Sequence, residues 1–173
     1  MTRTLPISGR WSDVQIQVYD VVYRAQTAAI EAVRPGAEFL EPHRVAMRIL
    51  AEALAEWGIL PIPVEEALEK TSGVYQRYTL HGTSHMLGLD VHDCAEARND
   101  SYRDGTLSPG MVLTVEPGLY FQLDDLTVPE QLRGIGVRIE DDILVTDTGH
   151  RNLSEALPRD RDEIERWMAD LRG

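Results

Sequence analysis

The sequence lacks several features that would place it in common classes of protein. Its 173 residues contain one cysteine, Cys94, which excludes an internal disulfide and favours a reducing compartment. No apolar run is long enough to span a bilayer, and the first ten residues lack the apolar stretch of a signal peptide. These absences predict a cytoplasmic protein that does not insert into a membrane.

Positive charge is also scarce. The chain has 17 lysines and arginines against 29 aspartates and glutamates, which gives a formal net charge of −12. Because nucleic acids and anionic membranes select basic surfaces, neither is expected as a partner. The formal count omits bound cations, so the acidic balance also fits a carboxylate-rich metal site. The length and a hydrophobic content of 43% predict one soluble globular domain with its own core.

The usual motifs of hydrolases and nucleotide-binding proteins are absent too. There is no His-Glu-x-x-His pair, no Gly-x-Ser-x-Gly turn and no glycine loop ending in Lys-Ser or Lys-Thr. The basic residues are scattered and form no patch interleaved with aromatic residues. These absences argue against a zincin-type site, a serine-hydrolase elbow, a phosphate-binding loop and a nucleic-acid interface.

The most informative stretch that is present runs from His81 to Asp93 and reads HGTSHMLGLDVHD. It holds three of the five histidines, together with two aspartates and two glycines. Neutral imidazoles bind divalent metals and transfer protons near pH 7, and glycines allow tight turns. A single histidine is usually an ordinary hydrogen-bonded residue, but a cluster of three favours a functional site. The neighbouring Cys94 is better interpreted as a free thiol in a loop than as a ligand or nucleophile.

Hydrophobic periodicity predicts an α+β fold. Helical spacing of apolar residues follows a capping serine, Ser12, and ends before Pro35-Gly36. The predicted helices span residues 13–34, 41–57, 63–71 and 160–171. After Gly73 the pattern favours strands over 74–80, 111–116 and 136–146, with loops over 94–109 and 122–134. This order predicts helices packed on a curved antiparallel or mixed sheet.

Two glutamates interrupt the apolar pattern of the last two predicted strands. Glu116 ends the first strand, and Glu140 shares one face of the second strand with Arg138 and Asp142. A glutamate within an apolar run is costly to bury unless it is paired or bound to a cation. With the histidines, these glutamates predict a site for Mn²⁺, Fe²⁺, Co²⁺ or Zn²⁺. The alternative is that Glu140 only pairs with Arg138 and that Glu116 lies at an exposed strand end.

Three segments resemble the aminopeptidase P/prolidase group of metallopeptidases, which have the pita-bread fold. They read HGTSHMLGLDVHD, GMVLTVEPGLY and RGIGVRIEDDILVTDTG. The run VPEQLRGIGVRIEDD resembles aminopeptidase P more than prolidase. The resemblance implies a metal-dependent Xaa-Pro aminopeptidase, whose substrate is a peptide with proline at the second position. A prolidase-type dipeptidase, a non-catalytic peptide-binding or protein-binding module and a metal-free hydrolase are the alternatives.

The resemblance also implies a set of metal ligands. The family has five, namely two aspartates followed by a histidine and two glutamates, and they bind two divalent ions, commonly Mn²⁺. By motif, His85, Glu116 and Glu140 correspond to the last three, with Glu140 shared by both ions. In the family these ions activate the attacking water and polarise the scissile carbonyl.

Further roles follow from the same resemblance. Glu116 would also shuttle a proton, and His92 would bind substrate and stabilise the tetrahedral intermediate. His81 would line the substrate pocket, and Arg138 would orient the cluster or balance its charge. Asp90 and Asp93 are expected to be structural.

One departure from the family is that its two aspartate ligands would precede Thr2, because residues 2–6 resemble the segment that follows the second of them. Residues 1–173 are therefore predicted to be a partial catalytic domain, the C-terminal part of the pita-bread fold. The chain alone is expected to bind at most one ion, weakly, and to have little activity. An open face is expected to drive self-association, giving a homo-oligomer.

Overall fold

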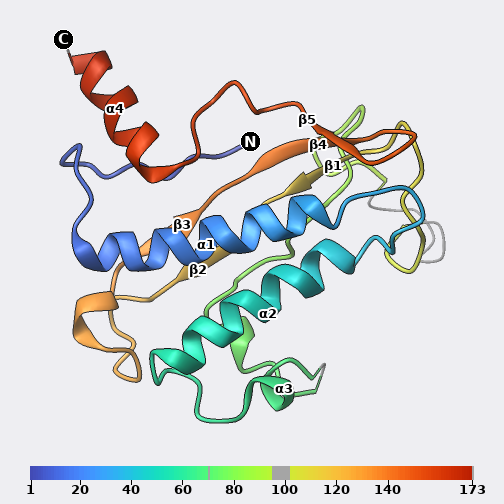
Figure 1. Cartoon of the computed structure of the whole chain (residues 1–173). Helices are drawn as coiled ribbons and strands as arrows, with labels where there is room; N and C mark the ends of the chain where they lie inside the picture. The colour runs from blue at the N-terminus through green and yellow to red at the C-terminus, as the bar shows by residue number, and fades with distance from the viewer. Residues whose placement is uncertain (70, 95–101, 173) are drawn as a thin grey trace.

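The structure is a computed structural model that describes residues 1–69, 71–94 and 102–172 (Figure 1). Four α-helices lie in the described residues: α1 (Asp13–Glu31), α2 (Glu41–Glu56), α3 (Val64–Ala67) and α4 (Arg161–Arg172). Its strands are β1 (Val112–Val115), β2 (Gly118–Tyr120), β3 (Gly136–Arg138), β4 (Asp141–Val145) and β5 (His150–Asn152). Two short 3₁₀ helices are η1 (Tyr75–Arg77) and η3 (Glu130–Leu132).

Helix α1 is the central helix of the fold and lies across the strands (Figure 1). Its first turn is closed by a capping box in which Ser12 and Gln15 satisfy each other's backbone N–H groups. Its buried side includes Val18, Val22 and Ala25, each fully buried in the core. Helix α2 lies beside α1 and buries its own apolar stripe in the same core (Figure 1).

The strands form two antiparallel sheets, and the residue pairing of the first continues without a shift into the second. The first sheet has the order β1-β4-β5, and the second consists of β2 and β3. Val115 faces Asp141 in the first sheet, and Gly118 faces Arg138 in the second. The same register therefore continues between them and places Glu116 opposite Glu140. Pro117 has no N–H to donate, which explains why the regular pairing stops at this point.

The histidine-rich stretch runs along the free edge of β1. The amides of Thr114 and Glu116 donate to the carbonyls of His85 and Thr83 at 2.9 and 2.8 Å, and the amide of Leu87 donates to the carbonyl of β1 residue Val112. These bonds extend the sheet by an irregular segment. They bring His85 to the edge where Glu116 and Glu140 already face each other.

Several predicted elements differ from the structure. The strand predicted over 74–80 is wrong, because that segment turns through η1 and an irregular stretch. The single strand predicted over 136–146 is divided into β3 and β4 at Ile139-Glu140. The third helix is shorter than predicted, and β2 and β5 were not predicted. Of the loop predicted over 94–109, residues 95–101 lie outside the described residues, and 102–109 are irregular.

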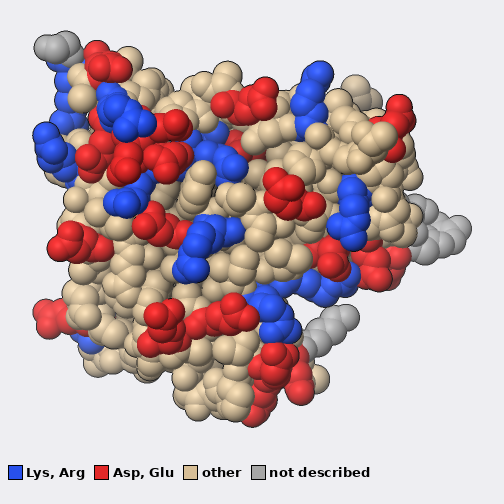
Figure 2. All heavy atoms as spheres, in the orientation of Figure 1, with Lys and Arg blue, Asp and Glu red and all other residues tan. Residues whose placement is uncertain are grey.

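The surface agrees with the scattered basic residues of the sequence. On the face drawn in Figure 2, acidic and basic side chains are interspersed, and the basic ones do not merge into a continuous patch. None of the helices in the described ranges is both long and apolar enough to cross a membrane. Cys94, the last described residue before the gap at 95–101, is exposed.

Candidate metal centre

Three side chains with metal-binding atoms meet at the break between the two sheets. One nitrogen of His85 and one carboxylate oxygen each of Glu116 and Glu140 all lie within 4.8 Å of one another. His85 Nε2 is 3.2 Å from Glu116 Oε1. Glu116 and Glu140 are only 7% and 8% exposed, so their charges are largely removed from water. The structure thus brings together the three residues that the sequence predicted as metal ligands.

The ring of His85 is held by a contact with the backbone. Its Nδ1 lies 3.0 Å from the backbone carbonyl of Met86, which can accept a hydrogen bond from Nδ1–H. This contact orients the ring so that Nε2 faces the glutamates. Such a hydrogen bond to a backbone carbonyl is the usual partner of a histidine that binds a metal.

Thr114 connects two of the three ligands. Its hydroxyl donates to Glu116 Oε1 at 3.0 Å and accepts the backbone N–H of His85 at 3.1 Å. The residue is only 1% exposed, so these bonds do not compete with water. Strand alternation places Thr114 and Glu116 on the same face of β1, which is why one hydroxyl can reach both ligands.

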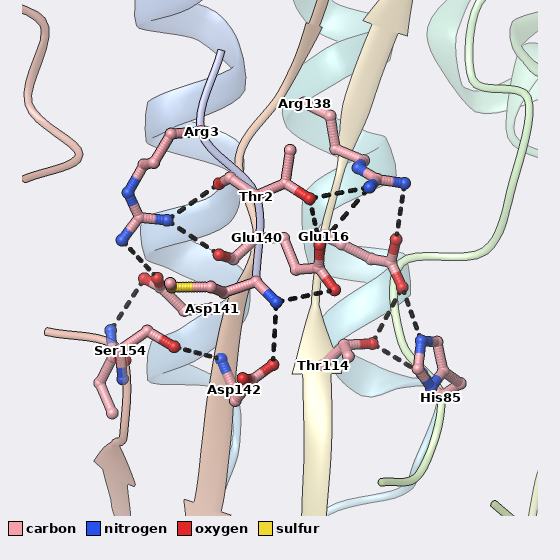
Figure 3. Close-up of polar contacts among 12 residues, drawn as sticks. Thr2, Arg3, His85, Thr114, Glu116, Arg138, Glu140, Asp141, Asp142 and Ser154 are labelled. Carbon is pink, nitrogen blue, oxygen red and sulfur yellow. Dashed lines mark hydrogen bonds and ion pairs between the residues drawn. The ribbon is translucent and has the colours of Figure 1, made fainter. Parts of the chain in front are cut away.

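Arg138 lies between the two glutamates. Its Nη1 is 3.4 Å from Glu116 Oε2, and its Nη2 is 3.5 Å from Glu140 Oε2. Nη2 also donates to the hydroxyl of Thr2 at 2.8 Å, and that hydroxyl donates to Glu140 (Figure 3). The expected pairing of Glu140 with Arg138 is present, but the other half of the simpler alternative is wrong, because Glu116 is buried rather than at an exposed strand end.

Asp141 is a buried residue of the site that the sequence analysis missed. It is fully buried and pairs with Arg3 at 2.7 Å, while Gln26 of α1 and Asn152 of β5 donate to it at 3.0 and 2.8 Å. Burial alone would raise the pKa of Asp141, but the hydrogen bonds from Gln26, Arg3 and Asn152 outweigh it and hold the pKa below its usual value. Asp141 falls on the apolar face of the predicted strand, together with Val137, Ile139, Ile143 and Val145. A charged residue on that face was the signal that could have revealed it.

Arg3 extends this network to the backbone beside the ligands. Its Nη1 donates to the carbonyls of Thr2 and Glu140 at 3.0 and 2.8 Å. The Thr2 and Glu140 backbones also exchange two hydrogen bonds, of 3.1 and 3.0 Å. The backbone of Glu140 is therefore fixed by a charged pair that lies behind the site.

The other predicted site residues surround the three ligands. His81 Nδ1 is 4.0 Å from Glu116 Oε2, and His81 Nε2 is 2.6 Å from the hydroxyl of Tyr120. The exposed ring of His92 stacks edge-on against His85, with ring centroids 4.5 Å apart. Tyr120 was not predicted, and burial raises its pKa, which keeps its hydroxyl protonated. Its ring lies over Gly118, where an added Cβ would be 2.5 Å from the Tyr120 hydroxyl.

Asp90 and Asp93 lie in the turn of the same stretch. Asp93 Oδ1 is 3.4 Å from the backbone N–H of Asp90, and its own N–H donates to the carbonyl of Met86 at 3.1 Å. Neither belongs to the group of three ligands. Their contacts fit the structural role expected from the sequence.

The chemistry of the donor set fits a divalent cation. Like charges directly opposite each other on paired strands are destabilising, and Glu116 and Glu140 hold such positions. A divalent cation would offset that repulsion together with Arg138, and it could be coordinated by Nε2 of His85. Carboxylate oxygens with an imidazole nitrogen suit Mn²⁺, Fe²⁺, Co²⁺ or Zn²⁺. Three protein ligands are fewer than the four to six that such ions take, so the described residues supply part of a coordination shell.

Comparison with known proteins identifies the family. Residues 1–147 match metallopeptidase family M24. This chain belongs to that family. It is 66% identical, over its whole length, to Xaa-Pro aminopeptidase 1 of Streptomyces coelicolor and covers 35% of that protein. It is 42% identical to the Xaa-Pro aminopeptidase of Escherichia coli, with 99% of this chain and 38% of that protein aligned.

Solved aminopeptidase P structures confirm the α+β pita-bread fold. Aminopeptidase PepP of Pseudomonas aeruginosa superposes with a TM-score of 0.91 at 39% identity, over 98% of this chain and 38% of that chain. Zinc-substituted aminopeptidase P of Escherichia coli in complex with product gives a TM-score of 0.90 at 42% identity, over 99% and 38%. The chain therefore spans little more than a third of the length of the relatives it matches.

Proposed function

We propose that this chain is the C-terminal part of the catalytic domain of a metal-dependent Xaa-Pro aminopeptidase, which releases an N-terminal residue next to proline. The observation that carries the proposal is the convergence of His85, Glu116 and Glu140 within 4.8 Å at the break between two sheets. Family membership and the Xaa-Pro aminopeptidases among the relatives support it. The single exposed Cys94 is compatible with a cytoplasmic protein.

His85, Glu116 and Glu140 would hold the metal, for which we propose Mn²⁺, with Co²⁺, Zn²⁺ or Fe²⁺ as alternatives. When bound, a divalent ion supplies Lewis acidity and lowers the pKa of coordinated water. The family resemblance implies two further aspartate ligands, and we propose that they come from sequence that precedes Thr2 in the complete domain. The three ligands present here would then form one side of a two-ion site.

The remaining residues of the cluster would act on the substrate. Glu116 would accept and return a proton, since Thr114 and Arg138 hold its carboxylate in a fixed orientation. His92 and His81 border the ligands and would bind the peptide around the scissile bond. Arg138 would balance the charge of the two carboxylates and hold their orientation.

Among the alternatives, the aminopeptidase is favoured. The named relatives are Xaa-Pro aminopeptidases rather than dipeptidases, and their identity extends over the whole of this chain. A binding module without metal does not require an imidazole nitrogen and two buried carboxylate oxygens within 4.8 Å of one another. The oriented ligand set therefore argues for metal-dependent catalysis.

A chimera tests the proposal directly. This chain would replace the aligned 35% of Streptomyces coelicolor Xaa-Pro aminopeptidase 1. We expect the chimera with Mn²⁺ to release alanine from an Ala-Pro peptide and to leave the matched Ala-Ala peptide intact. Glu140→Gln should lower turnover about a hundredfold or more, because it removes a ligand and its charge.

The matched control is Glu52→Gln, an exposed glutamate on α2, which should leave turnover unchanged. A folded chimera that binds Mn²⁺ but does not cleave Ala-Pro peptides would contradict the proposal. Equal activity of the Glu140→Gln and Glu52→Gln variants would contradict the ligand assignment.

A further inference from the structure

Arg3 is a buried cation that has no part in the proposed mechanism. Its side chain is only 6% exposed, and in Figure 3 it lies on one side of Glu140 while Glu116 lies on the other. The hydroxyl of Thr2 reaches the carboxylate of Glu140 on the side of the metal ligands. Because side chains alternate along an extended segment, Arg3 points to the opposite side, where it meets Asp141.

The guanidinium of Arg3 makes a full set of hydrogen bonds. It donates to four backbone carbonyls and one carboxylate oxygen, at 2.7 to 3.0 Å: the carbonyls of Thr2, Glu140, Leu157 and Pro158, and Oδ1 of Asp141. A guanidinium has five N–H donors in a fixed planar arrangement, so these bonds use all of them. The side chain is therefore held in one orientation.

Two of these bonds fix the backbone of a metal ligand. Glu140 lies in the break between β3 and β4, and its backbone pairs with Thr2 in an isolated antiparallel bridge. The two residues exchange hydrogen bonds of 3.1 and 3.0 Å. Both carbonyls of this bridge also accept a hydrogen bond from Nη1 of Arg3, at 3.0 and 2.8 Å. Arg3 thus holds the backbone from which the Glu140 carboxylate reaches the other ligands.

Charge pairing alone does not account for this arrangement. A buried ion pair often contributes little net stability, because both charges lose their hydration. Asp141 already accepts hydrogen bonds from Gln26 and Asn152 at 3.0 and 2.8 Å. A second arginine, Arg159, lies 3.8 Å from its Oδ2. Among the described contacts of Arg159 none involves the bridge carbonyls, so holding the bridge is specific to Arg3.

We propose that Arg3 is a positioning residue of the metal centre, which sets the metal affinity by holding the backbones of Thr2 and Glu140 and touches no metal itself. The inference rests on the proposed function, since it takes Glu140 as a ligand. Groups that orient a metal ligand from behind change metal affinity by about ten- to a hundredfold when they are removed. A lysine at position 3 keeps the positive charge beside Asp141, but its single ammonium group cannot reproduce the five bonds of the planar guanidinium.

The test compares Arg3→Lys with the parent 173-residue chain by titration with Co²⁺. Calorimetry measures the affinity, and the visible absorption of bound Co²⁺ reports the coordination geometry. We expect Arg3→Lys to bind Co²⁺ about tenfold more weakly and to shift the absorption bands, because the Glu140 carboxylate is no longer held in place. Urea unfolding of the metal-free proteins measures any loss of stability separately.

The matched control is Arg159→Lys. Arg159 also lies beside the buried carboxylate of Asp141, and its Nη1 donates to Gln26 and Thr27 at 2.7 and 2.8 Å. The control should leave the Co²⁺ affinity and absorption unchanged, even where it lowers the urea midpoint. Unchanged Co²⁺ affinity and absorption in Arg3→Lys, or equal changes in both variants, would overturn the positioning role and leave the proposed function intact.

Failure of the positioning role and failure of the proposed function give different results. If Arg3→Lys weakens Co²⁺ binding but the chimera does not cleave Ala-Pro peptides, the positioning role is supported and the proposed function is contradicted. If Glu140→Gln binds Co²⁺ as tightly as the parent chain, both the ligand assignment and the positioning role are wrong. A parent chain that binds no Co²⁺ would overturn the positioning role in this chain.

Discussion

At the scale of single residues, Thr114 is the clearest test of how the ligands are held. Its hydroxyl contacts Glu116 and the backbone of His85, and it binds no metal itself. Thr114→Val has nearly the same shape but lacks the hydroxyl, so we expect Mn²⁺ affinity to fall about tenfold. We also expect a loss of about 1 kcal/mol in the free energy of unfolding, because a buried N–H loses its acceptor.

Titration calorimetry with Mn²⁺ and urea unfolding measure the two effects. Thr114→Ser keeps the hydroxyl and should restore most of the metal affinity, although it leaves a small cavity. The chain itself is predicted to take up at most one ion. Two tightly bound ions, or equal affinities of the valine and serine variants, would contradict this account of the site.

Asp141 gives a prediction about pH. Its folded-state pKa is lowered, so its contribution to stability is complete above the unfolded pKa of about 3.9 and is lost as pH falls through the folded value. Asp141→Asn should cost about 3 kcal/mol at pH 7, since it leaves Arg3 without its buried partner. The variant should also lose less stability than the parent when the pH drops below about 4.

Urea unfolding between pH 3 and pH 7 checks both statements. Asp162→Asn on α4 is the control, because that carboxylate is 63% exposed in its side chain and lies 3.7 Å from Arg161. It should change stability by less than about 0.5 kcal/mol at any pH. Parallel pH curves for the parent and Asp141→Asn would show that Asp141 does not carry the acid sensitivity.

At the scale of secondary structure elements, the sequence predicts what local chemistry decides. Helix α1 begins where Ser12 caps it, and α2 occupies 41–56 against a prediction of 41–57, because caps, glycine and apolar spacing are local signals. The segment 74–80 was mistaken for a strand because Val74 and Tyr75 favour strands. Tertiary packing instead turns it through η1.

The division of the second predicted strand has a non-local cause. Nothing in the run from Gly136 to Val145 marks a break at Glu140, whereas its partner strand contains Pro117, which cannot complete the ladder. Strand β5 was not predicted, because its three residues form a strand only by pairing with β4 across the turn at Gly149. The facing of Glu116 and Glu140 follows from this register, which a single strand pattern does not reveal.

Helix α1 matters for the site because it carries Gln26 to Asp141. Ser12→Ala removes one side of its capping box and should lower the free energy of unfolding by about 1 kcal/mol. Ser12→Asp retains an acceptor at the cap and suits the positive end of the helix dipole, so it should be close to neutral. Urea unfolding of both variants, with circular dichroism as the probe, distinguishes a cap effect from general damage, since only a cap effect separates alanine from aspartate.

At the scale of the whole molecule, the chain leaves apolar surface uncovered. A cavity of about 580 Å³ is lined by residues from three segments, including Leu5, Ile7, Trp11, Ile135 and Val137. Ile7 is 98% exposed at its margin, and Leu5 is 40% exposed. Uncovered apolar surface of this kind favours association between chains.

We therefore expect the purified chain to self-associate, with a mass by light scattering above 19.5 kDa at tens of micromolar protein. Ile7→Asp places a charge at the margin of this cavity and should shift the mass toward that of the monomer. Leu126→Asp, at a position 81% exposed in the loop before η3, is the matched control and should leave the mass unchanged. A monomeric mass for the parent chain across this range would contradict self-association. If Ile7→Asp and Leu126→Asp change the mass equally, the contact between chains does not involve this cavity in particular. A charge at Ile7 weakens association specifically only if a second copy covers that side chain.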